Sequence, residues 1–206
     1  VGNAAEYLEE IGAATTQGDQ VMNSDLVRLG YKNLTTEFPI SGDGIKVGVL
    51  SDSYNFLNVA SGDVYNFDLP GADANQQLSF TQKYQNFNNV QVLKELPAIY
   101  GPGTDEGRAM LQIIHDVAPK AKLAFRTGFI TAGDFAKGIR DLKDNPAYKC
   151  DIIVDDITHI TEPFFTDGKV AQAVNYVTEQ GVSYFTAAGN FGNKSYEGVF
   201  NPTSPG

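Results

Sequence analysis

The feature that most constrains this chain is an alternation of short apolar runs and longer amphipathic segments. The apolar runs are rich in β-branched and aromatic residues, as strands buried on both faces are. They lie at residues 45–50, 121–125, 151–154 and 182–187. The segments between them carry apolar side chains at helical spacing. Because right-handed βαβ crossovers place successive strands in parallel, we predict an α/β fold with a mostly parallel sheet flanked by helices on both faces.

Two regions before the second strong strand have a less regular pattern. Residues 1–43 mix small and acidic residues and predict an N-terminal lead-in with one or two short helices, followed by a single α/β domain over residues 44–206. Residues 54–89 are rich in Asn, Gln and Asp and predict a surface excursion. A weak strand is expected at residues 90–93. A helix is expected at residues 105–116, because acidic residues favour the positive end of a helix dipole.

Composition narrows the classes of partner. The chain has 15 basic and 25 acidic residues and a net charge of -10, which opposes binding to nucleic acid or to an anionic membrane surface. No apolar run approaches the roughly 18 residues of a membrane span. The single cysteine, Cys150, has no nearby histidine to activate it and is interpreted as a packing residue.

Polar residues that directly follow strands are the candidate functional residues, because ligands collect at the carboxyl ends of parallel strands. The candidates are Asp52, Asp156 and Asn190, together with Glu106 at the start of the first central helix. Three of them also have a structural interpretation. Asp52 could be a turn residue at the strand end, Glu106 a favourable charge at a helix start, and Asn190 a support for the Gly189 turn. The adjacent acids Asp155 and Asp156 lack the spacing of a calcium-binding loop. No metal or cofactor is therefore predicted, and a structural calcium ion is left open.

Four segments resemble subtilisin-like peptidases, in that family's order. Residues 42–53 resemble the segment that ends at the triad aspartate, and residues 103–123 resemble the histidine segment. Residues 151–156 resemble the substrate-binding strand, and residues 181–192 resemble the strand that delivers the oxyanion-hole asparagine. The resemblance implies the three-layer subtilisin-like fold and covers the front portion of that domain, with its C-terminal part missing.

The resemblance implies a role for each candidate residue. Asp52 matches the triad aspartate. A gapless alignment would place Ser51 at that position, but we prefer Asp52 because only a carboxylate can hold and polarise the catalytic base. Glu106 stands at the histidine position, as in the sedolisins, where a glutamate is the general base. We expect it to share a proton with Asp52. Asn190 would donate to the oxyanion, and Asp156 would contact substrate, as a third acid or as a selector for basic side chains.

Two features depart from the sedolisin pattern. Sedolisins carry an aspartate one turn after the glutamate, where this chain has Met110, and they replace the oxyanion asparagine, which is retained here. The overall pattern is closer to a bacterial branch of subtilase-like proteins with an Asp-Glu-Gly signature. Neither His115 nor His159 is expected to replace the missing histidine, because the first lies nine positions after Glu106 and the second lies in a loop.

The nucleophile is missing from the predicted site. No Gly-Thr-Ser motif follows Asn190, and Ser195 and Ser204 lie in loop-like contexts, so the resemblance implies a serine outside these 206 residues. The leading hypothesis is a secreted or periplasmic serine-type endopeptidase acting on peptides or proteins. The alternative is a catalytically inactive module that binds a peptide or cationic ligand. A nucleotide-binding domain is disfavoured, because no Gly-x-Gly-x-x-Gly follows the first strand.

Overall fold

The structure is a computed structural model that describes residues 14–28, 40–70, 90–194 and 197–199. Its centre is a five-stranded sheet in the order β2-β3-β1-β4-β5, in which every neighbouring pair is parallel. The strands are β1 (Lys46–Ser51), β2 (Gln91–Lys94), β3 (Lys122–Thr127), β4 (Ile152–Asp155) and β5 (Ser183–Thr186). The predicted α/β class and parallel sheet are confirmed, including the weak strand β2.

The strand order places a topological switch at β1. The chain builds β2 and β3 on one side of β1 and then crosses to build β4 and β5 on the other side. In such sheets, the crevice beyond the carboxyl ends of the strands at the switch point is the usual ligand site. The residues that follow β1 and β4 therefore occupy the most favourable position for function.

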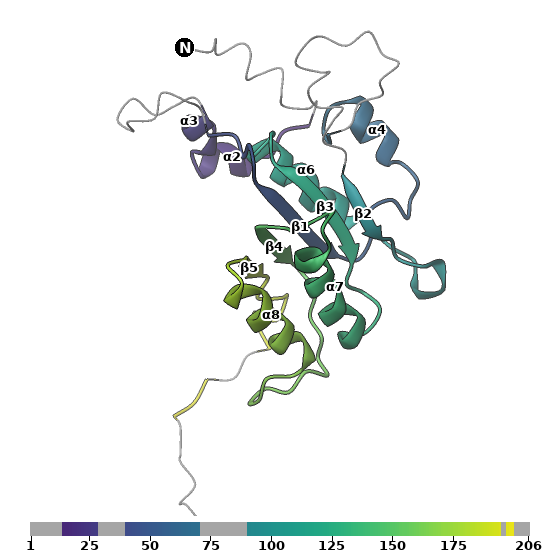
Figure 1. Cartoon of the computed structure of the whole chain (residues 1–206), viewed down its shortest axis with the longest axis vertical. Helices are drawn as coiled ribbons and strands as arrows, with labels where there is room; N and C mark the ends of the chain where they lie inside the picture. Colours follow the sequence, from purple (N-terminus) through teal and green to yellow (C-terminus); the bar gives the residue numbers. More distant parts are fainter. Residues whose placement is uncertain (1–13, 29–39, 71–89, 195–196, 200–206) are drawn as a thin grey trace, which may run out of the picture.

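Three longer helices connect these strands (Figure 1). They are α6 (Glu106–Val117), α7 (Ala132–Asp144) and α8 (Lys169–Glu179). Helix α7 begins where the Thr131 side chain accepts a hydrogen bond from the Asp134 amide at 3.1 Å, as an N-cap residue does. Helices α7 and α8 pack against each other, and α6 contacts β1 and β3.

The core consists of two apolar clusters that take alternate residues of β1. Val47 and Val49 belong to a cluster with Leu111 of α6. Leu50 belongs to a second cluster with Phe135 of α7 and Val177 of α8. Successive side chains of a strand point to opposite faces, so β1 is buried on both, as its continuous apolar sequence predicts.

Part of the predicted lead-in packs against α6 (Figure 1). It contains α2 (Gln17–Val21) and α3 (Ser24–Arg28), which agrees with the expected short helices. The Arg28 guanidinium forms a buried ion pair with Asp19 and donates to the Val117 carbonyl at the end of α6, at 3.0 Å. The rest of the lead-in lies outside the described residues.

The predicted surface excursion is described only in its first part. That part contains a short helix, α4 (Ala60–Tyr65), which the sequence did not predict. A 3-10 turn, η1 (Ala98–Tyr100), follows β2. Residues 71–89 of the excursion lie outside the described residues.

Candidate functional site

The Asp52 carboxylate joins the end of β1 to the start of α6. It is 8% exposed and accepts hydrogen bonds from both segments. One oxygen accepts the Ser53 amide and, at 3.0 Å, the Glu106 amide. The other oxygen accepts the Thr104 amide and, at 2.7 Å, the Thr104 hydroxyl. Asp52 therefore acts as a cap for α6 that comes from a distant part of the chain.

This cap is needed because α6 lacks one of its own. Asp105, at the N-cap position, has a left-handed backbone with a φ of 59° and makes no side-chain cap. Its carboxylate instead accepts the Ser53 hydroxyl at 3.0 Å and the Phe56 amide at 2.7 Å. A negative charge from Asp52 at the positive end of the helix is favourable. Burial alone would raise the pKa of Asp52, but its hydrogen bonds outweigh burial and lower that pKa.

Glu106 is the first residue of α6, and its side chain is exposed. Asp52 fixes its backbone, but its carboxylate makes no hydrogen bond with any described residue. Gly107, the next residue, lets α6 start close to the sheet because it has no side chain. A Cβ at this position would lie 2.3 Å from the Phe125 ring. This close approach brings Glu106 to the carboxyl ends of the central strands.

Asp156 is the acidic neighbour of Glu106. The Ser51 hydroxyl at the end of β1 donates to one carboxylate oxygen at 3.0 Å, and the other oxygen is buried without a partner among the described residues. Burial raises the pKa of Asp156 to about 6, and the charges of Glu106 and Asp155 contribute to the rise. The sequence-based expectation paired Glu106 with Asp52 for proton sharing; in the structure Asp156 has the raised pKa and Asp52 has the lowered one.

Asn190 follows β5 at the same edge of the sheet. It is exposed, and Gly189 before it has a φ of +76°, which favours glycine. The Asn190 side chain makes no hydrogen bond with the described part of the chain, so its amide is available to a ligand.

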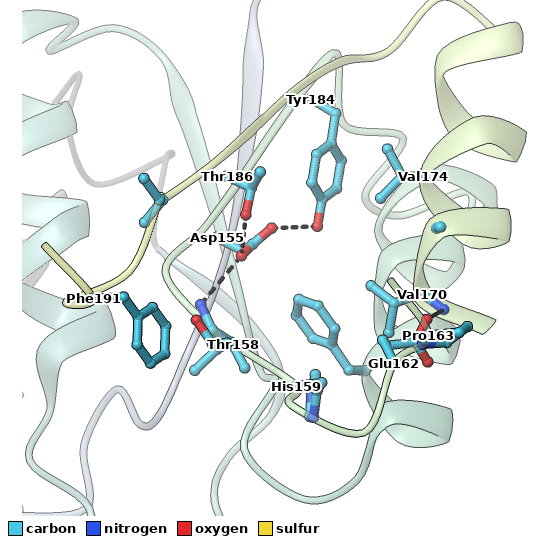
Figure 2. Close-up of a pocket in the computed structure, with 15 residues that line it drawn as sticks. Asp155, Thr158, His159, Glu162, Pro163, Val170, Val174, Tyr184, Thr186 and Phe191 are labelled. Atoms are coloured by element: carbon cyan, nitrogen blue, oxygen red, sulfur yellow. Dashed lines mark hydrogen bonds between the residues drawn. The ribbon is translucent and has the colours of Figure 1, made fainter. Parts of the chain in front are cut away.

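A cavity of about 390 Å³ opens between the ends of β4 and β5 and helix α8. Figure 2 shows the Tyr184 and Thr186 hydroxyls converging on the Asp155 carboxylate, at 2.5 and 2.9 Å. Phe135 and Phe191 are among the aromatic residues of its wall. Asp156 does not line the cavity, because adjacent residues at a strand end point to opposite faces.

Sequence reasoning named Asp155 only as one of a pair of acids and missed its partners on β5. A signal was present, since Asp155 and Thr186 are polar residues at the ends of two apolar strands. The parallel register pairs them directly. Only the strand order shows that β4 and β5 are neighbours.

The two histidines and the cysteine of this part of the chain have a packing role rather than a place among the candidate acids. His115 is 1% exposed in α6, and burial lowers its pKa to about 4. The His159 ring packs against Phe135 with the centroids 5.0 Å apart. Cys150 is fully buried, and burial raises the pKa of its thiol to about 12, which confirms its predicted packing role.

Comparisons with known proteins add no family to these observations. No protein-family model matches the chain, and no curated protein does. Within the described residues, no cluster of three or more His, Cys, Asp or Glu side chains is arranged to hold a metal ion. No helix of the described segments has the length and apolar character needed to cross a bilayer.

Proposed function

We propose that this chain contributes the acidic part of the active site of a serine-type endopeptidase with a subtilisin-like fold. The observation that carries the proposal is a pair of acids at the switch point of a parallel sheet, where burial and the charge of Glu106 raise the pKa of Asp156 to about 6. Groups with a pKa near neutrality at such a crevice are suited to general acid–base chemistry. The four segments that resemble subtilisin-like peptidases support the same class.

Each residue then has a distinct role. Glu106 accepts the proton of the attacking hydroxyl, and Asp156 holds a proton beside it below about pH 6. Asp52 is a positioning residue, because it accepts the Thr104 and Glu106 backbone amides and the Thr104 hydroxyl. Asn190 donates its side-chain amide to the oxyanion that forms on the substrate carbonyl. The proposal requires a serine nucleophile from outside these 206 residues.

The role of Glu106 is tested on the full-length protein that carries this sequence. Cleavage of an unfolded protein substrate is measured for the parent, for Glu106→Gln and for Glu179→Gln, which removes an exposed acid from α8. Loss of a general base lowers the rate by about 100-fold or more. We expect this loss in Glu106→Gln alone. Undiminished cleavage by Glu106→Gln rules out the proposed base.

A second candidate is a catalytically inactive module that binds peptides. It is favoured by the free carboxylate of Glu106, which has no histidine or hydroxyl partner among the described residues, and by the cavity beside β5. A serine-reactive phosphonate separates the two candidates. Failure of the folded full-length protein to react supports the binding module, whereas labelling of a serine in a Gly-Thr-Ser motif rejects it.

A further inference from the structure

The cavity beside β5 contains a buried carboxylate with unused capacity to accept a hydrogen bond. Asp155 is 3% exposed and accepts three hydrogen bonds, from the Tyr184 hydroxyl, the Thr186 hydroxyl and the Ile157 amide. An ionised carboxylate offers about four acceptor positions. One position therefore remains, on the oxygen that accepts only Tyr184.

The charge of this carboxylate has no lysine or arginine partner among the described residues; the His159 ring, which also lines the cavity, lowers the pKa of the carboxylate less than the hydrogen bonds do. No lysine or arginine is among those that line the cavity, and no ion pair forms between Asp155 and the described part of the chain. Burial raises the pKa of Asp155, and hydrogen bonds from Tyr184 and Thr186 oppose this effect. A buried carboxylate without a lysine or arginine partner is unfavourable when ionised, so a cationic ligand would be stabilised here.

The remaining walls suit the stem of a long side chain. Val170 and Val174 of α8 form one wall, and the lining also includes Phe135 and Phe191, aromatic residues of the kind that can attract cations. Glu162 adds a second carboxylate to the lining, where it accepts the Val170 amide at 3.1 Å. A volume of about 390 Å³ lies in the range of small-ligand sites.

We propose that this cavity binds a basic side chain, arginine or lysine, of a peptide. In this proposal the methylene stem packs against the two valines and the cationic group lies beside Asp155; Figure 2 labels these three residues of the lining. The sequence had suggested Asp156 as the selector for basic side chains, but Asp155 is the residue that faces the cavity. Calling this peptide a substrate rests on the proposed function; the binding itself does not.

Binding without turnover tests this proposal. Three probes are titrated into the isotope-labelled 206-residue chain and followed by NMR: the N-acetyl methylamides of arginine, citrulline and phenylalanine. Citrulline has the shape of arginine without its charge. Since hydrogen bonds to charged groups are the stronger ones, we expect citrulline to bind at least about tenfold more weakly than arginine. The shifts should map to the residues that line the cavity.

Three variants locate the effect. Asp155→Asn should reduce arginine binding by about tenfold or more, and Asp151→Asn, which removes a charge at the other end of β4, should not. Ala171→Leu, on helix α8 in the cavity wall, should block binding while the charge of Asp155 is kept, and it covers the case in which Asp155→Asn fails to fold. Phenylalanine binding as tightly as arginine overturns the proposal, as does the absence of binding by all three probes. Neither result bears on cleavage that depends on Glu106.

Discussion

Replacement of the buried histidine of α6 gives the most quantitative test of the structure. His115 is 1% exposed, and both ring nitrogens are buried without a hydrogen-bond partner among the described residues. Burial lowers its pKa from 6.5 to about 4, because the charged ring loses its hydration. The folded protein therefore carries this histidine in its neutral form down to mildly acidic pH.

The sign and size of the effect follow from proton linkage. Between about pH 6.5 and pH 4 the unfolded chain binds a proton at His115 and the folded chain does not, so the free energy of unfolding falls as the pH is lowered. The loss from this residue is about 2 kcal/mol between about pH 7.5 and pH 5, and about 3 kcal/mol once pH 4 is reached. His115→Leu removes the loss. It also removes two unpartnered nitrogens, which raises stability at neutral pH by about 1 kcal/mol or more.

Urea unfolding followed by circular dichroism at several pH values measures this difference. The difference in unfolding free energy between His115→Leu and the parent should grow by about 2 kcal/mol from about pH 7.5 to about pH 5. Gln112→Leu, on the same helix, adds the same side chain at a non-titrating position and should shift stability equally at each pH. An identical pH dependence for the parent and His115→Leu would refute the placement of this histidine in a dry interior.

The acidic site and the close helix–sheet contact give three further predictions. Asp52→Ala should lower the free energy of unfolding by about 2–4 kcal/mol in urea unfolding, since it leaves the amides at the start of α6 without an acceptor, and Asp52→Asn should cost less because one acceptor oxygen remains. Gly107→Ala should destabilise by about 2 kcal/mol or more in thermal unfolding because its Cβ overlaps the Phe125 ring, whereas Gly133→Ala, with its nearest neighbour at 3.9 Å, should be neutral or stabilising. Asp156→Asn should gain stability relative to the parent as the pH rises from about 4 to about 7, since a raised carboxyl pKa destabilises the folded state increasingly as the unfolded carboxyl ionises; a constant difference across this range would contradict the raised pKa.

The sequence alone determined the class of fold and the identity of the strands. A run that is apolar at nearly every position, such as residues 45–50, is stable as a strand when both of its faces are buried. The helical spacing of the segments between such runs predicts helices that connect parallel strands. These are local patterns with a period that can be read along the chain. For the same reason the polar residues after β1 and β4 could be identified as candidates before their positions were known.

The tertiary structure decided which of these candidates meet. Asp52 and Asp156 both follow buried strands, yet one carboxylate caps α6 and the other lies beside Glu106. Which carboxylates become neighbours depends on the order of the strands in the sheet and on the direction of each side chain at its strand end. The local periodicity of the sequence specifies neither. The cavity at Asp155 has the same origin, because its donors come from β5, about thirty residues along the chain, and meet it only when β4 and β5 pair.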